Sequence, residues 1–154
     1  MARTRGISYL EKEGIPFEER CYDHQVKGAR FAAESTGIPL EMMIKSLLIQ
    51  VDEGSFVFAL MPGDQELSLK KLARAAGVRK AAMAKPEDAQ RVTGYLVGGM
   101  SPLGARKAFP VYLHQSLDSF PSVTINAGQR GVLVTLATAD LKHTVRAVTA
   151  DIAE

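Results

Sequence analysis

A lysine interrupts a run of residues that is otherwise typical of a buried strand. Lys45 follows Met42-Met43-Ile44 and precedes Ser46-Leu47-Leu48-Ile49. In such a strand a lysine usually lies on the solvent-exposed face of the sheet or extends its ammonium group to the surface. Alternatively, it is a fixed cation that binds a phosphate, or an amine that acts on a substrate. The sequence leaves both interpretations of Lys45 open.

A glycine-rich stretch is the second candidate for chemistry. Residues 94–104, here called the glycine loop, contain four glycines and Pro102 among eleven residues. Such a loop allows a ligand to approach the main chain closely, and its N–H groups could bind an anion or an oxyanion. Its spacing fits neither the phosphate loop GxxxxGK[ST] nor the dinucleotide fingerprint GxGxxG. The structural alternative is a strand and a tight turn packed at a corner of the domain.

Nucleophile and metal chemistry find little support in the sequence. Cys21 and His24 would point to opposite faces of a strand, and Ser101 lacks a local base. The single cysteine forms no internal disulfide, and the three histidines, of which His114 and His143 are the other two, lie far apart in the sequence. We therefore expect neither a metal ion nor a cofactor.

Positive charge is concentrated in the middle of the chain, although the formal net charge is only +2. Residues 70–107, here called the basic block, carry 9 basic and 2 acidic side chains. The basic members are Lys70, Lys71, Arg74, Arg79, Lys80, Lys85, Arg91, Arg106 and Lys107. This clustering predicts a surface for a polyanion, with an ordinary solvated face as the alternative.

The pattern of apolar, glycine and proline residues predicts a mixture of helices and strands. We expect helices at residues 8–13, 28–37, 69–76, 86–91 and 139–148, and strands at 17–22, 44–51, 56–61, 80–83, 111–113, 123–126 and 132–136. Ser68 and Gly77 are a typical N-cap and C-cap. Strict βαβ alternation is missing, which predicts one compact α+β domain over residues 1–154, with a mixed or barrel-like sheet and surrounding helices.

Neither a signal peptide nor a membrane-spanning run is recognised, so we expect a cytoplasmic protein without membrane contact.

Four stretches of the sequence carry a family resemblance. They are Ile44-Lys45-Ser46-Leu47-Leu48, Leu69-Lys70-Lys71-Leu72-Ala73, Arg91-Val92-Thr93-Gly94-Tyr95-Leu96-Val97-Gly98-Gly99-Met100-Ser101-Pro102-Leu103-Gly104 and Gly128-Gln129-Arg130-Gly131. Together they resemble the YbaK family of aminoacyl-tRNA deacylases, which is similar to the editing domain inserted in bacterial prolyl-tRNA synthetases. The resemblance runs from about residue 9 to residue 152 and is strongest to the Cys-tRNA(Pro) deacylase branch.

The resemblance implies that a wrong amino acid is released from the acceptor end of an aminoacyl-tRNA. For cysteine, the family is thought to let the thiol of the substrate attack its own ester and form a thiolactone, so that the enzyme is a lyase rather than a hydrolase. Prolyl-tRNA synthetase is an expected partner. The resemblance assigns catalysis to Lys45, Gly98, Gly99 and Ser101. It assigns substrate binding to Tyr22, His24, Phe31, Ser46, Gly94, Tyr95, Met100, Pro102 and Asn126. With the basic block it assigns tRNA binding to Lys70, Lys71, Arg106, Lys107 and Arg130.

Two positions depart from the nearest branch and affect the expected specificity. That branch commonly has a serine before the Gly-Gly-x-Arg-Gly turn and an aspartate two residues after it, where this sequence has Asn126 and Leu133. A changed polar group in a small pocket can change the preferred side chain. Removal of alanine or another small amino acid therefore stays an alternative to removal of cysteine. A non-catalytic module that binds tRNA or a synthetase is the competing class.

Overall fold

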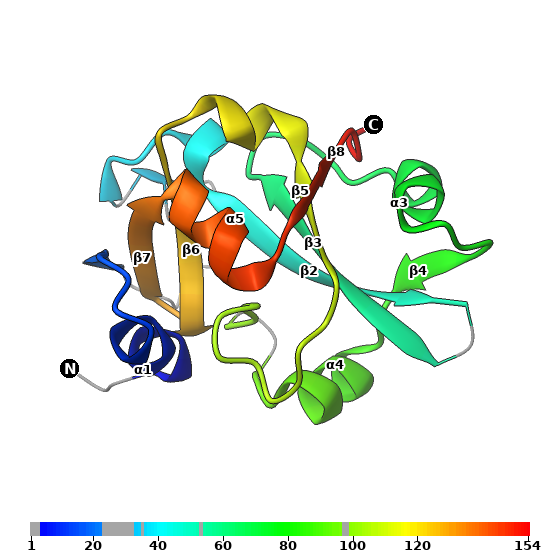
Figure 1. Ribbon diagram of the computed structural model, residues 1–154, viewed down its shortest axis with the longest axis horizontal. Coiled ribbons are helices and arrows are strands. Elements are labelled where there is room, and N and C mark those ends of the chain that lie inside the picture. The colour runs from blue at the N-terminus through cyan, green and yellow to red at the C-terminus, as the bar shows by residue number, and fades with distance from the viewer. Residues whose placement is uncertain (1–3, 23–32, 35, 53, 97–98) are drawn as a thin grey trace.

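A long antiparallel hairpin forms the centre of the molecule. The computed structural model describes residues 4–22, 33–34, 36–52, 54–96 and 99–154, which Figure 1 shows. The hairpin strands, β2 (Ile44–Val51) and β3 (Ser55–Pro62), pair along their entire lengths. Both strands are rich in apolar residues, which favour a strand buried on both faces. The predicted hairpin is confirmed.

The hairpin belongs to a mixed sheet with the strand order β4-β2-β3-β5-β8. The strand β4 (Ala81–Met83) pairs antiparallel with the far end of β2. On the other side β5 (Val111–His114) lies parallel to β3, and β8 (Val148–Ala150) lies parallel to β5. The 3-10 helix η2 (Gln115–Ser119) follows β5 directly.

A second sheet has the order β1-β7-β6 and is entirely antiparallel. Its strands are β1 (Glu18–Cys21), β6 (Ser122–Gln129) and β7 (Val132–Ala137). The two sheets meet beside the 3-10 helix η1 (Leu40–Met42), where Met43 forms a bridge with Thr124. The α+β class is confirmed, and the strands form two sheets rather than a closed barrel in the part of the chain that is described.

Local capping signals mark both ends of one helix. In α3 (Leu69–Ala76) the Ser68 hydroxyl accepts the N–H of Lys71 at 3.1 Å, and Gly77 ends the helix with φ of 70°. The other α-helices that lie wholly within the described residues are α1 (Arg5–Lys12), α4 (Pro86–Thr93) and α5 (Thr138–Val145). None of the helices described is both long and apolar enough to cross a membrane.

The chain after α5 differs from the prediction. We expected a helix up to residue 148, but α5 ends at Val145 because Arg146 adopts a left-handed conformation with φ of 54°. The chain then turns into β8, which the local pattern did not predict. Of the predicted helix at residues 28–37, residues 28–32 and 35 lie outside the described part.

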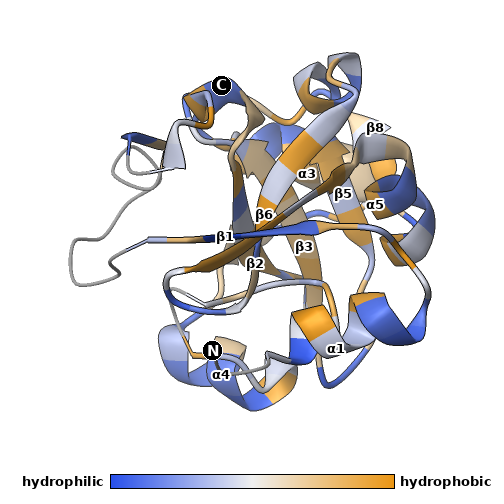
Figure 2. Ribbon diagram, turned by 90° about the vertical axis from the view of Figure 1, so that its left-hand side faces the viewer, coloured by the Kyte–Doolittle hydropathy of each residue, from blue (hydrophilic) through white to orange (hydrophobic). Residues whose placement is uncertain are grey.

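The core has two main clusters on opposite faces of β2. Ile44 and Leu48 belong to the first, which also contains buried residues of α1, β6, β7 and the glycine loop. Leu47 and Ile49 belong to the second, which packs against α3. In Figure 2 the central strands are largely hydrophobic, whereas hydrophilic residues gather on β1 and the helices. Because side chains alternate along a strand, Lys45 shares the face of Leu47, and Ser46 shares the face of Ile44.

Candidate functional site

The ammonium group of Lys45 is held by the main chain that follows β3. Its Nζ donates a hydrogen bond of 2.7 Å to the carbonyl oxygen of Gln65 and lies 3.7 Å from Oε1 of Glu66. The Lys45 side chain keeps 23% of its surface exposed. Gln65 is fixed in turn because its Nε2 donates to the Ser116 hydroxyl at 3.3 Å. The partly exposed cation therefore has a defined position next to solvent.

The end of the chain holds this segment in place. The N–H of Ser68 donates to the Ile152 carbonyl at 2.7 Å, and the N–H of Glu154 donates to the Glu66 carbonyl at 3.0 Å. Ile152 is fully buried in the second cluster, and its N–H donates to Nδ1 of His114 at 3.2 Å. His114 must therefore be unprotonated at Nδ1.

Burial lowers the pKa of His114 below its usual value. Asp151 opposes this shift of the pKa, Lys71 adds to it, and Asp64 opposes it more weakly. The hydrogen bond from Lys71 lowers the pKa of the Asp151 carboxyl group. The neutral form of His114 is thus the form that the folded chain favours.

The hydroxyl group of Ser46 lies inside the protein without a hydrogen-bond partner among the described residues. Burial of a polar group without a partner costs free energy, and in native proteins such a group calls for an explanation. A ligand that accepts or donates a hydrogen bond at this point would remove the cost. Ser46 is therefore a predicted substrate-binding residue whose hydroxyl is not used by the described part of the fold.

The glycine loop is stabilised by hydrogen bonds within itself. The Tyr95 hydroxyl donates to the Leu103 carbonyl, and the Leu103 N–H donates to the Ser101 hydroxyl at 3.1 Å. Burial raises the pKa of Tyr95 to about 12, although the Arg5 cation acts in the opposite direction. Met100 is buried, and its sulfur accepts the Thr93 hydroxyl at 3.1 Å. The hydroxyls of Tyr95 and Ser101 therefore hold the shape of the loop.

The loop packs closely against the turn between β6 and β7. A Cβ on Gly99 would stand 3.0 Å from Cα of Gln129. Gly128 has φ of 106°, and a Cβ there would meet the Tyr95 ring at 2.7 Å. Oδ1 of Asn126 accepts the N–H groups of Gly128 at 2.7 Å and Gln129 at 3.1 Å, which shapes the bulge in this turn. Part of the role of Asn126 is therefore structural.

A pocket of about 450 Å³ lies between the loop and this turn. Its lining residues are Gln90, Gly94, Tyr95, Leu96, Gly99, Gly128, Gln129 and Arg130. The structure thus brings four of the predicted site residues together around one cavity.

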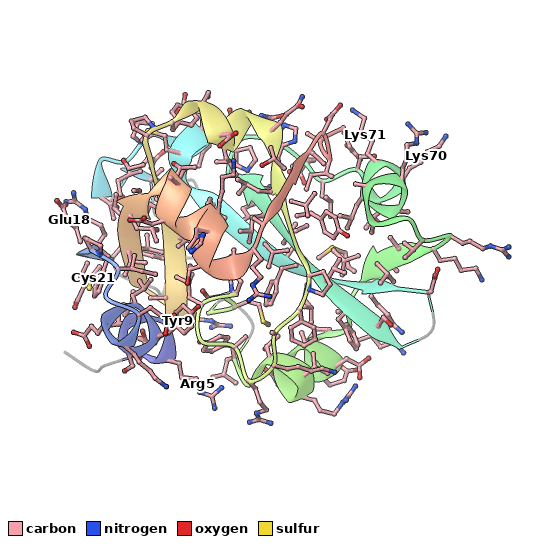
Figure 3. The ribbon with its side chains drawn as sticks, in the orientation of Figure 1. Arg5, Tyr9, Glu18, Cys21, Lys70 and Lys71 are labelled. Atoms are coloured by element: carbon pink, nitrogen blue, oxygen red, sulfur yellow. The ribbon has the colours of Figure 1, made fainter. Side chains whose placement is uncertain are left out.

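The basic block is divided between distant parts of the molecule. In Figure 3 Lys70 and Lys71 lie on α3, across the molecule from Arg5, which is near the glycine loop. Lys71 donates to Oδ2 of Asp151 at 3.0 Å, and Nζ of Lys107 lies 5.8 Å from the Phe109 ring centroid. The interpretation of residues 70–107 as one surface is therefore too simple.

Arg5 is a residue near the loop that the sequence did not single out. Its Cζ lies 5.7 Å from the ring centroid of Tyr95. No local motif could have found it, because only the packing of α1 brings it to residues 94–95.

The remaining predicted site residues are placed less fully by the structure. His24, Phe31 and Gly98 lie outside the described residues. Tyr22 packs in a small third cluster with Leu133, and Pro102 is partly buried. Within the described ranges, no group of three or more His, Cys, Asp or Glu side chains could hold a metal ion.

Comparison with known proteins matches residues 23–144 to the aminoacyl-tRNA editing domain. A protein of Enterococcus faecalis, EbsC, named as a candidate Cys-tRNA(Pro)/Cys-tRNA(Cys) deacylase, is 35% identical over 137 residues, which cover 88% of this chain and 84% of EbsC. A proline–tRNA ligase of Thermosipho africanus is 35% identical over 89 residues, 58% of this chain but only 16% of the ligase. A crystal structure described as a candidate trans-editing enzyme for prolyl tRNA synthetase superimposes with a TM-score of 0.89 at 28% identity, covering 97% of this chain and 95% of that one.

Proposed function

Because the chain belongs to the aminoacyl-tRNA editing domain family, we propose that it removes a wrongly attached amino acid from tRNA, with cysteine on tRNA(Pro) as its main substrate. The observation that carries this proposal is the match over residues 23–144, which includes Lys45, Ser46 and the glycine loop. The identity with EbsC, which is named for Cys-tRNA(Pro), supports the choice of cysteine.

In this proposal the protein acts mainly by holding an already activated ester. An ester between an amino acid and the terminal ribose needs no strong enzymatic nucleophile, so positioning supplies much of the rate. Lys45 turns its partly exposed ammonium group toward a phosphate of the tRNA end. The Ser46 hydroxyl, which lacks a partner among the described residues, bonds to the aminoacyl group.

The glycine loop stabilises the ester oxygen as it gains negative charge. The N–H of Gly99 already donates to the Leu96 carbonyl at 3.0 Å. The donors in our proposal are therefore the main-chain N–H groups of Met100 and Ser101, to which the described residues offer no acceptor. Donors fixed by the protein need no reorganisation during the reaction, which makes them effective for an oxyanion.

For cysteine, the substrate supplies the nucleophile. Its sulfur attacks the ester carbonyl, a C–S bond forms, the C–O bond to the ribose breaks, and the thiol proton passes to the ribose oxygen. The products are uncharged tRNA and a cyclic thiolactone. For alanine, water would have to attack instead and give the free amino acid. Identification of the released product by mass spectrometry therefore distinguishes the lyase from the hydrolase.

A deacylation panel tests the proposal. Cys-tRNA(Pro), Ala-tRNA(Pro) and Ser-tRNA are incubated with the protein, and the loss of the ester is followed over time. We expect the fastest release from Cys-tRNA(Pro). Lys45→Ala should lower the rate about 10-fold or more because a charge-assisted bond is worth about 1.5–3 kcal/mol, whereas the surface variant Lys142→Ala should not. Binding of charged tRNA without ester loss from any substrate would instead support a non-catalytic module.

The ligase match favours prolyl-tRNA synthetase as a partner of this activity. Only 16% of the length of the Thermosipho africanus ligase is covered by this chain, so the chain corresponds to one part of that enzyme. A separate chain with this activity would gain from acting near a synthetase that produces the mischarged tRNA. Co-elution with prolyl-tRNA synthetase in the presence of tRNA(Pro) tests this partnership, and separate elution would contradict it.

A further inference from the structure

Two guanidinium groups that are far apart in the sequence converge on Gly94. Cζ of Arg5 and Nε of Arg106 each lie 3.2 Å from the point where a Cβ on Gly94 would stand. Gly94 has φ of 80°, a conformation that favours glycine, and its lack of a side chain leaves the space that Arg5 occupies. The backbone is therefore shaped to bring two cations together.

Neither of these cations is paired with a carboxylate in the part of the chain that is described. Arg5 lies over the Tyr95 ring, and Nη1 of Arg106 donates to the main-chain carbonyl of Arg91 at 3.4 Å. The nearby carboxylate of Asp88 is bonded to the guanidinium of Arg91 at 3.2 Å. Two neighbouring positive groups repel each other, and an anion between them removes the repulsion.

The two arginines lie beside the pocket next to the glycine loop, although neither lines it. Gly94 and Tyr95, which these arginines contact, both line that pocket. Leu96 also lines it, although 70% of this apolar residue is exposed. Two cations beside a pocket that is lined in part by an exposed apolar residue suit a nucleotide, whose phosphate is charged and whose base has an apolar face.

We propose that Arg5 and Arg106 bind one phosphodiester group of a single-stranded RNA 3′ end, with the adjacent base against Leu96. The identity of this RNA as a tRNA acceptor end rests on the proposed function. Guanidinium groups bind phosphate oxygens through two parallel hydrogen bonds, which a lysine cannot do. Contact with the Tyr95 ring holds Arg5 in place before the RNA arrives.

Binding of a labelled ACCA oligonucleotide, measured by fluorescence anisotropy at several salt concentrations, tests the proposal. We expect Arg5→Ala and Arg106→Ala each to weaken binding at least fivefold and to lower the slope of log affinity against log salt by about 0.7. Arg5→Lys should restore only part of the affinity. The matched control is Lys12→Ala, which removes an exposed cation from the last turn of α1, the helix that begins with Arg5.

A second measurement locates the contacted phosphate by changing the oligonucleotide. The unmodified protein is titrated with ACCA oligonucleotides in which one linkage at a time is an uncharged methylphosphonate. One linkage should lose at least fivefold in affinity, and this loss should disappear in Arg5→Ala. Equal binding of all the oligonucleotides, or an equal effect of Lys12→Ala and Arg5→Ala, would overturn the phosphate site.

Deacylation of Cys-tRNA(Pro) by the same variants separates this site from the proposed function. If Arg5→Ala changes neither binding nor turnover while Lys45→Ala stops turnover, the phosphate site is wrong and the deacylase proposal stands. If oligonucleotide binding depends on Arg5 but no tRNA is deacylated, the phosphate site stands and the deacylase proposal fails.

Discussion

Replacement of Ser46 by alanine should make the protein more stable and less active. The Ser46 hydroxyl is buried and has no hydrogen-bond partner in the described chain. A buried polar group that lacks a partner costs about 1–3 kcal/mol. Ser46→Ala removes this group but keeps Cβ, so it leaves little empty volume. We expect the free energy of unfolding to rise by about 1 kcal/mol, which corresponds to about 2–4 °C in Tm for a chain of this size.

Ser101 offers a matched control of opposite sign. It is also buried, but its hydroxyl accepts the Leu103 N–H at 3.1 Å. Ser101→Ala leaves this buried N–H without an acceptor and should lower the free energy of unfolding by about 1–3 kcal/mol. The same chemical change at two buried serines should therefore shift stability in opposite directions.

Urea unfolding followed by far-UV circular dichroism measures both effects, since the chain has no tryptophan for a fluorescence signal. Deacylation by Ser46→Ala should fall about 3- to 10-fold, the equivalent of one hydrogen bond of about 0.5–1.5 kcal/mol. A loss of stability in Ser46→Ala as large as that in Ser101→Ala would refute the reasoning, because the hydroxyl would then have a partner. An unchanged deacylation rate would remove Ser46 from the substrate site.

Two further predictions concern the elements around the site. Gly6→Ala would normally stabilise a helix by about 0.5–1 kcal/mol, but here the new Cβ would stand 2.8 Å from the carbonyl carbon of Ala127. We therefore expect Gly6→Ala to lower the free energy of unfolding by about 1–3 kcal/mol. The exposed control variant Ser8→Ala should change the free energy of unfolding by no more than about 0.5 kcal/mol. Stabilisation by Gly6→Ala would contradict the close packing of α1 against Ala127. Because burial lowers the pKa of His114 in the folded state, its contribution to stability should be complete above about pH 6.5 and decline as the pH falls toward the folded pKa. His114→Asn, which keeps an acceptor for the Ile152 N–H, should flatten the dependence of unfolding free energy on pH in this range, and an unchanged slope would show that His114 is not its source.

Elements with complete local signals could be predicted from the sequence. The helix α3 has its N-cap at Ser68 and its αL glycine at Gly77, as expected, because both signals act within one turn of the helix. The strand β8 could not be predicted, because it depends on parallel pairing with β5, whose residues are more than 30 positions away. Likewise, a left-handed conformation at Arg146 is rare for a residue other than glycine, so no local signal marks the end of α5 at this position.

The candidate site was predictable only in its individual residues. Lys45 is a charged residue within an apolar run, and the glycine loop contains four glycines among eleven residues. Both features therefore stand out in the sequence alone. The approach of Arg5 to Gly94 depends on the packing of α1 beside the loop, and no local pattern encodes it. The division of the basic block has the same cause, because α3 and the glycine loop are near each other in sequence but lie on different sides of the fold.

Lys45 and Ser46 are neighbours on β2, and their side chains point to opposite faces of the strand. The pairing with β4 begins only at Ile49, and the bridge to β6 involves Met43. Between these points the edge at residues 45–47 has no strand partner in the described part of the chain. The Gln65 carbonyl that accepts from Lys45 belongs to a segment in which Glu66 and Ser68 are hydrogen-bonded to Glu154 and Ile152. The position of this cation therefore depends on residues 152–154 as well as on β2.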